Sequence, residues 1–383
     1  MKIASARVRA IRLPLRRPLV TSTHTLEVRD GFVLLLEGED GLIGHGEASP
    51  VWWADGESLA AAGVALDEIV HACREGELDD EGLLAVLGPA TGAGGERESE
   101  LLAAIESTGA PSGRAALETA LLDLAARRAG VSVAAWLAAR EVTHGPAARL
   151  EVNALATASD PDGLAAEAEA LVARGFATIK VKVGAVAPEQ DVARVAGLRR
   201  GGAGEVRLRL DANRAWDPDD ARRVLDAVAG EDVDYVEEPL AEAHPEALAR
   251  LREQSGAAIA VDESLGAMAD LEELGAAGAC DVVVLKPARL GGPTRTLGVA
   301  RRARELGLRV VLTDSIESAV GRAATAHVAA VLPVAGAIGL GGASVLAADV
   351  VGEGAPALEP RVEIEGPGLG IGAVATGAVA GVR

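Results

Sequence analysis

Apolar positions recur along the chain in two different rhythms. Residues 1 to about 48 contain the apolar runs ASARVRAIRLPL and DGFVLLLEGEDGLIGHGEA, and Glu39-Asp40-Gly41 inside the second run is typical of a hairpin turn. From residue 58 to residue 130, Ala and Leu recur at helical spacing. Residues 1–128 therefore predict an α+β unit that precedes a different architecture.

From about residue 150 a short apolar strand, a polar loop and an amphipathic helix alternate. Asp160-Pro161 is typical of a helix start, and Gly175 of its end. The polar ends of eight such strands fall near residues 155, 181, 211, 237, 262, 286, 314 and 340. This near-constant spacing predicts a closed parallel barrel. A doubly wound open sheet is the alternative, but its usual Gly-rich phosphate loop is absent from the sequence.

Composition and net charge disfavour some classes of binding partner. Of 383 residues 49% are apolar, and a net charge of −20 disfavours nucleic acid and anionic membranes as partners. The two isolated cysteines, Cys73 and Cys280, predict free thiols in a reducing cytoplasm. The first residues lack a signal-peptide pattern, and no long uncharged apolar run occurs. We expect a cytoplasmic protein that binds a small molecule, with a homo-oligomer possible.

Ionisable residues stand at the ends of five successive predicted strands. The active site of such a barrel lies at the carboxyl ends of its strands, and side chains two residues apart share a face. One point at the barrel mouth is thus predicted to collect lysines and acids. The strand-end residues are Lys180, Lys182, Asp211, Asn213, Glu237, Asp262, Glu263 and Lys286.

These residue types favour one kind of chemistry. Asp211, Glu237 and Asp262 are hard oxygen donors that suit Mg²⁺, with Mn²⁺ possible, and no His or Cys stands with them. Two ammonium groups side by side favour loss of a proton from one, which makes a lysine a usable base. The pattern predicts metal-assisted removal of the proton next to a carboxylate, with a lysine as the base. A structural ion-pair network and a non-catalytic binding barrel remain alternatives.

The motifs TIKVKVG, LRLDANRAW, VEEPL, VDESL and VLKPARLGG resemble the muconate-lactonizing subgroup of the enolase superfamily. This resemblance implies a modified (β/α)7β TIM barrel over residues 129–345, and an N-terminal capping domain completed by residues 346–383. It also implies that Lys182 is the base supported by Lys180, and that Lys286 acts from the second face. Mg²⁺ would be held by Asp211, Glu237 and Asp262, with Asn213 and Glu263 beside it.

Within the subgroup, PSGRAALETALLDLAARRAG, TDSIESAVGRAATAHVAAVLP and GLGGASVLAADVV are most similar to the o-succinylbenzoate synthases of menaquinone biosynthesis. That likeness implies Mg²⁺-dependent dehydration of 2-succinyl-6-hydroxy-2,4-cyclohexadiene-1-carboxylate through an enediolate. It also implies a succinyl pocket shaped by Ser315, Glu317, Ser318, Gly341 and Gly342.

The activity, the substrate class and the role of one segment stay open at this point. An N-succinylamino acid racemase, or a related epimerase or cycloisomerase, would use Lys182 and Lys286 as its bases. A dipeptide substrate is disfavoured, because GLGGAS lacks the Asp-x-Asp of dipeptide epimerases. The polar segment 17–29 is expected to form a loop over the substrate. Its central residues Thr21, Ser22, Thr23 and His24 receive no assigned contact.

Overall fold

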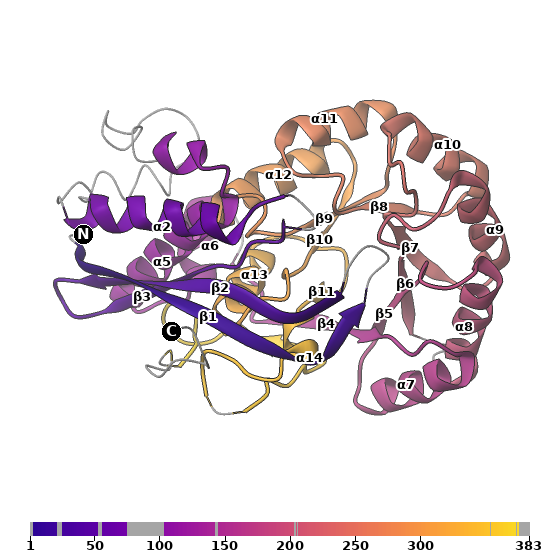
Figure 1. Cartoon of the computed structure of the whole chain (residues 1–383), viewed down its shortest axis with the longest axis horizontal. Coiled ribbons are helices and arrows are strands. Elements are labelled where there is room, and N and C mark those ends of the chain that lie inside the picture. The colour runs from indigo at the N-terminus through magenta and orange to yellow at the C-terminus, as the bar shows by residue number, and fades with distance from the viewer. Residues whose placement is uncertain are drawn as a thin grey trace.

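The computed structural model describes residues 3–20, 25–52, 56–74, 103–141, 145–202, 204, 206–352, 354–372 and 374. An antiparallel sheet with its helices lies beside a parallel barrel, and two long strands of the sheet run across to the barrel mouth (Figure 1). This is the α/β architecture with an N-terminal cap that the strand spacing and motifs predict.

The cap sheet has the antiparallel order β1-β2-β3. The predicted turn after β2 is present, with Gly41 at φ +76°. Gly46 of β3 lies so close to helix α5 that a Cβ there would stand 1.8 Å from the Ala116 carbonyl oxygen, so only glycine allows this packing. The elements are β1 (Ile3–Val20), β2 (Thr25–Gly38), β3 (Ile43–Ala48), α2 (Leu59–Arg74), α5 (Pro111–Ala129) and α6 (Val133–Glu141).

The segment 17–29 differs from its prediction as a loop. Residues 17–20 end β1 and residues 25–29 begin β2, so most of the segment is a β-ribbon. Residues 21–24, which include the four unassigned polar side chains, lie outside the described residues. Just before this ribbon, β1 contacts the segment that follows residue 345, because Ala347 N–H donates to the Pro14 carbonyl and Arg16 donates to that of Leu346.

Eight parallel strands form the barrel, in the order β10-β9-β8-β7-β6-β5-β4-β11. A bridge between Thr313 and Gly339 joins the two ends of this order and nearly closes it. Away from the mouth, apolar side chains of the strands fill the interior together with the fully buried Arg209 of β6, which donates to the Ala337 carbonyl. The strands are β4 (Arg149–Ala156), β5 (Thr178–Lys182), β6 (Arg207–Asp211), β7 (Val233–Glu237), β8 (Ile259–Val261), β9 (Val282–Leu285), β10 (Arg309–Leu312) and β11 (Ile338–Gly339).

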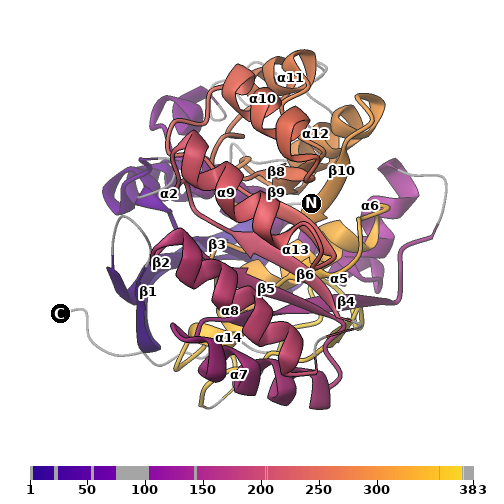
Figure 2. The same ribbon diagram turned by 90° about the vertical axis from the view of Figure 1, so that its right-hand side faces the viewer.

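Helices surround the barrel strands on the outside (Figure 2). The predicted start of α7 is present: the Asp160 side chain accepts from Gly163 N–H, and Gly175 follows at φ +92°. The helices are α7 (Pro161–Ala173), α8 (Pro188–Arg200), α9 (Pro218–Val228), α10 (Pro245–Ser255), α11 (Met268–Ala277), α12 (Pro293–Glu305), α13 (Ala319–Ala330) and the short α14 (Gly342–Val345).

The described C-terminal residues touch both barrel and cap. Strand β12 (Arg361–Glu363) pairs with β4 of the barrel. Farther along, Leu369 N–H donates to the buried Asp123 of α5 at 2.8 Å, and Gly368 accepts from Val133 N–H of α6. The tail therefore links the two parts, as the resemblance implied.

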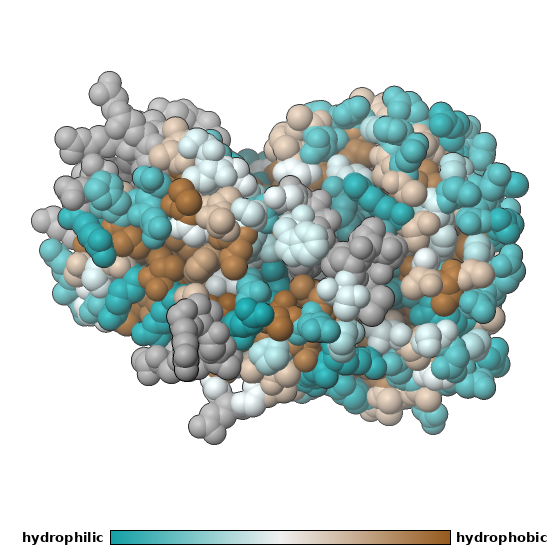
Figure 3. All heavy atoms as spheres, viewed as in Figure 1, coloured by the Kyte–Doolittle hydropathy of each residue, from teal (hydrophilic) through white to brown (hydrophobic). Residues whose placement is uncertain are grey.

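The surface in Figure 3 differs between the two parts. Polar side chains dominate over the outer barrel helices, whereas apolar side chains gather over the cap sheet and the junction. Among the described residues, every helix is too short or too polar to cross a membrane.

Candidate active site at the carboxyl ends of the barrel strands

Strand register brings the predicted residues to one level. Lys182 at the end of β5 pairs in register with Asp211 at the end of β6, and Asp211 with Glu237 at the end of β7. Parallel strands in register present their last side chains to the same side, so these groups meet at the mouth. Asp262 and Lys286 directly follow β8 and β9.

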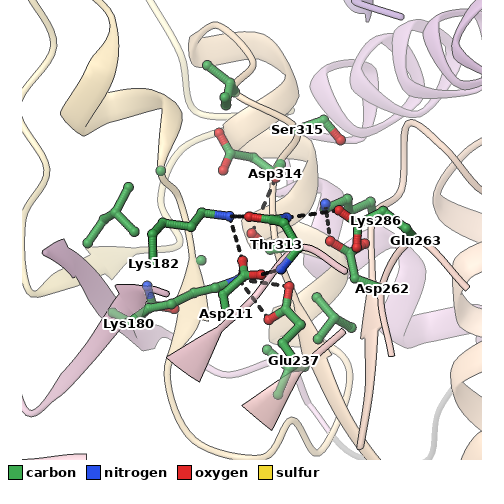
Figure 4. Close-up of a pocket in the computed structure, with 18 of the residues that line it drawn as sticks. Lys180, Lys182, Asp211, Glu237, Asp262, Glu263, Lys286, Thr313, Asp314 and Ser315 are labelled. Atoms are coloured by element: carbon green, nitrogen blue, oxygen red, sulfur yellow. Dashed lines mark hydrogen bonds and ion pairs between the residues drawn. The ribbon is translucent and has the colours of Figure 1, made fainter. Parts of the chain in front are cut away.

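A cavity of about 140 Å³ opens at this place. The described residues of its wall include all eight strand-end residues predicted from the sequence, together with Leu19 of β1 and Val51 after the cap sheet. Cap and barrel therefore enclose the cavity jointly. In Figure 4, Lys182 enters from one side and Lys286 from the other, with Asp211, Glu237 and Asp262 lying below them.

Lysine ammonium groups bond directly to the three acids. Lys180 Nζ lies 2.8 Å from Asp211 Oδ2 and 2.7 Å from Glu237 Oε2. Lys182 Nζ lies 2.6 Å from the same Asp211 oxygen, and Lys286 pairs with Asp262. The acids are almost fully buried, so these pairs experience little screening by solvent.

Crowded negative charge marks the centre of the site. Burial and the charges of Asp211 and Asp262 raise the pKa of Glu237 to about 8, although Lys180 opposes the shift. Burial also acts to raise the pKa of Asp211, but the nearby charges of Lys180 and Lys182 outweigh it and lower that pKa. Three carboxylates on consecutive strands that repel one another require cations among them.

The site therefore fits a hard divalent cation by its donor set: three carboxylates, with water or substrate oxygens to complete a shell. Among the residues that the structure describes, no three acid, imidazole or thiol groups are already arranged at coordinating distance. The lysines compensate the acids instead.

The ion pairs with the acids also change one expectation about the pKa of the lysines. Burial alone would lower the pKa of Lys180, but the carboxylates of Asp211 and Glu237 outweigh it and raise the pKa well above the usual value. The pKa of Lys286 is raised in the same way by Asp262. Of the two neighbouring lysines, Lys180 is therefore not the one that loses its proton easily in this arrangement, because acids rather than a second ammonium group dominate its surroundings.

Neighbouring polar groups hold the acids in place. Asn213 donates to Glu263 at 3.0 Å and accepts from Lys182, which places both predicted neighbours in the cavity wall. Arg289 donates to Asp262 Oδ1 at 2.9 Å. The fully buried Glu238 accepts from the backbone N–H groups of Asp262 and Ser264, which fixes the loop after β8.

The five residues predicted to shape the substrate pocket divide into three groups. Ser315 and Gly341 line the cavity. Gly342 supports the wall from behind, where its N–H donates to Asp314. Glu317 and Ser318 point away toward the cap: Ser318 bonds to Glu47 of β3, and Glu317 shares a separate small cavity with that residue. Their place corrects the prediction of a direct pocket role, because the turn after β10 directs them to the cap.

Comparison with known proteins agrees with this geometry. Residues 163–374 match the enolase C-terminal domain-like model, and residues 3–137 match the N-terminal domain of mandelate racemase and muconate lactonizing enzyme. The chain belongs to the enolase superfamily.

Relatives in the superfamily include epimerases, a racemase and cycloisomerases. A hydrophobic dipeptide epimerase of Enterococcus faecalis is 30% identical over 86% of this chain and 87% of its own. A crystal structure of dipeptide epimerase from that organism, complexed with Mg and the dipeptide L-Leu-L-Tyr, aligns with a TM-score of 0.84 at 27% identity, covering 97% of this chain and 100% of its own. A chloromuconate cycloisomerase of a Pseudomonas species is 31% identical over 87% and 85%. An N-succinyl-L-Arg/Lys racemase of Bacillus cereus is 26% identical over 86% and 84%.

Two residues of this superfamily member were missed by reasoning from sequence. Asp314 comes two residues after the end of the seventh barrel strand and lines the cavity, so the rule of reading strand ends would have found it. Arg29 is 2% exposed and donates to carbonyls of the cap and of the loop after β10. No local pattern identifies it, because its partners are distant in the sequence.

Proposed function

We propose that the protein is a divalent-metal-dependent racemase or epimerase that moves the proton next to a substrate carboxylate. Lys182 and Lys286 act as the two bases from opposite faces of the α-carbon. The observation that carries this proposal is their placement: the two amines enter one cavity from opposite sides, and the three carboxylates lie below them. A single base on one face would suffice for a dehydration, whereas inversion at carbon uses one on each face.

The use of lysine supports the same proposal. Among the 37 Lys and Arg residues only four are lysines, at positions 2, 180, 182 and 286, and three of these line the cavity. Arginine serves the chain almost everywhere else that a positive charge is needed. Arginine keeps its proton under all physiological conditions, so only lysine can accept a proton from a substrate.

Each group of the chain then has a defined task. Neutral Lys182 removes the α-proton from one face while the Lys286 ammonium group delivers a proton to the other, and the roles reverse for the opposite enantiomer. Lys180 places positive charge beside the substrate carboxylate. Asp211, Glu237 and Asp262 would hold Mg²⁺, which supplies Lewis-acid stabilisation of negative charge on the substrate. Leu19 and Val51 help to exclude water from the cavity.

The o-succinylbenzoate synthase reaction is the second candidate. The three quoted stretches favour it, including the two that supply the walls after β10 and β11. The relatives named above favour the first candidate, since they are isomerases. Both candidates begin with the same proton abstraction by Lys182.

Proton exchange in D₂O separates the candidates. We expect the protein with Mg²⁺ to exchange the α-hydrogen of suitable D- and L-N-succinylamino acids or dipeptides, followed by proton NMR. Lys182→Ala should retain exchange from one enantiomer only and Lys286→Ala from the other, and each should reduce racemisation by at least about 10²-fold. Arg222→Ala, an exposed change on α9, is the control and should behave as the parent protein.

Aromatisation of the cyclohexadiene acid without α-exchange of any amino-acid derivative would assign the synthase reaction instead. Full racemisation by either lysine variant would refute the two-base assignment.

A further inference from the structure

Asp314 differs from the three proposed metal ligands in how its charge is balanced. Its side chain is nearly buried, 5% exposed, and it lines the same cavity as Lys182 and Lys286. The three ligands each pair with lysine. Among the described residues, no cationic side chain forms an ion pair with Asp314.

Backbone groups hold this carboxylate without neutralising it. The N–H groups of Glu317 and Gly342 both donate to its Oδ2 atom, at 3.3 and 2.9 Å. Two cations act on it electrostatically without forming an ion pair with it: Arg322 pairs with Asp349, and Arg29 donates to backbone carbonyls. Burial raises the pKa of Asp314, and Arg322 and the backbone N–H groups only partly oppose that shift. A buried carboxylate in this position gains from any cation that enters the cavity.

The next residue supplies a second acceptor. The Ser315 hydroxyl is buried in the same cavity wall and has no hydrogen-bond partner among the described residues, whereas buried hydroxyls are normally bonded. Ile316 follows at φ +60°, a strained conformation for a β-branched residue, and Arg29 holds its carbonyl at 3.2 Å. The loop is thus fixed with Asp314 and Ser315 at the cavity. Figure 4 shows both on the side of the pocket away from Glu237.

We infer that Asp314 and Ser315 form a subsite for a cationic group, so that the substrate carries an ammonium or guanidinium group at the end opposite its carboxylate. This inference rests on the proposed function and names the substrate class. The lysines attract the carboxylate end, and Asp314 with Ser315 accepts hydrogen bonds from the cationic end. The dehydration substrate considered above would instead bring a second carboxylate against Asp314.

Matched probes test this inference through α-hydrogen exchange in D₂O with Mg²⁺. N-acetyl-L-lysine, N-acetyl-L-2-aminoheptanoate and N-acetyl-L-2-aminoadipate have side chains of similar length that end in a cation, a methyl group and an anion. L-alanyl-L-leucine and propionyl-L-leucine differ only by the ammonium group. We expect kcat/KM to favour the cationic member of at least one set by about 10- to 100-fold.

Asp314→Asn keeps the shape and the backbone hydrogen bonds, and should reduce that preference to under about 3-fold with the neutral probe little changed. The readout is a ratio within one protein, so partial loss of folded enzyme cancels. Asp191→Asn is the matched control: Asp191 is also buried and accepts from a backbone N–H at 2.7 Å, but it lies outside the cavity wall and pairs with a different arginine, Arg194. Its variant should keep the cation preference.

A preference of the parent protein for neutral or anionic probes would overturn the inference. A preference for cationic probes that persists in Asp314→Asn would overturn it as well. Exchange of neutral probes that depends on Lys182 but lacks a cation preference would refute the subsite and leave the proposed function standing. If no probe exchanges, the proposed function fails, and calorimetric binding of the same probes then tests the subsite alone. Tighter binding of the cationic probe that is lost in Asp314→Asn supports the subsite. Equal binding of cationic and neutral probes refutes it.

Discussion

At the scale of single residues, the site is defined by three of the four lysines in a chain that otherwise uses arginine for positive charge. Lys180 and Lys182 stand two residues apart on β5, and Lys286 approaches from β9. All three bond to acids that are themselves crowded together. The protonation of the lysines is therefore coupled to whatever else binds those acids.

This coupling predicts that Mg²⁺ lowers the pKa of Lys180. The carboxylates of Asp211 and Glu237 raise that pKa, so a divalent cation sharing their charge should allow Lys180 to lose its proton at lower pH. With only four lysines in the sequence, ¹³Cε-lysine NMR resolves the titration, and single Lys→Arg changes assign the signals.

Asp211→Asn supplies the control for this titration. It should lower the pKa of Lys180 without metal, because one paired charge is lost, and should abolish most of the response to Mg²⁺. A Lys180 titration that is unmoved by millimolar Mg²⁺ in the parent protein would contradict the metal assignment.

At the scale of elements, the turn between β10 and α13 connects cavity and cap. Glu317 in this turn lies beside Glu47 of β3, and Ser318 at the start of α13 bonds to the same glutamate. Burial and the charges of Glu47 and Asp314 raise the pKa of Glu317 to about 8. The fold therefore holds Glu317 in its neutral form at neutral pH.

We predict that ionisation of Glu317 destabilises the protein. A carboxyl group with a raised folded-state pKa binds its proton more tightly when folded, so its stabilising contribution is present below pH about 4.5 and is lost as pH rises through about 8. Glu317→Gln should remove this component of the pH dependence and flatten the free energy of unfolding between those values. Urea unfolding at several pH values measures it.

Glu363→Gln, an exposed change on β12, is the comparison and should leave the pH profile as it is in the parent protein. An equally steep profile in Glu317→Gln would show that the carboxyl group ionises freely.

At the scale of the whole molecule, Arg29 joins the cap to the barrel. Its guanidinium group donates to the Pro50 carbonyl of the cap at 2.5 Å and to the Ile316 carbonyl of the barrel at 3.2 Å. The acids Glu317, Glu47 and Asp314 surround it electrostatically. Arg29 thus fixes the cap against the loop that carries the proposed cation subsite.

Removal of Arg29 should weaken this junction. Arg29→Met leaves buried carbonyls and acids without their cation, so we expect a loss of about 3 kcal/mol or more in the free energy of unfolding, measured in urea. Arg12→Met on neighbouring β1 removes an exposed ion pair with Asp30 and should cost less than about 1 kcal/mol. Equal effects of the two changes would refute a special role for Arg29.

The sequence by itself determined the barrel and the centre of the site. Strand spacing is set by local alternation of apolar and polar residues, and a barrel gathers strand ends at one face, so the positions of Lys182, Asp211 and Glu237 followed from order along the chain. Their contacts depend only on register between neighbouring strands.

Tertiary structure decided what depends on contacts between distant segments. The ribbon at residues 17–29, the burial of Arg29 and the turn of Glu317 toward Glu47 arise where the cap meets the barrel, and local sequence cannot specify which segment will pack there. The charge state of Lys180 was likewise set by its partners across strands. Asp314 combines both cases: its place near a strand end could be read from the sequence, but only the fold shows that no cationic side chain of the described residues forms an ion pair with it.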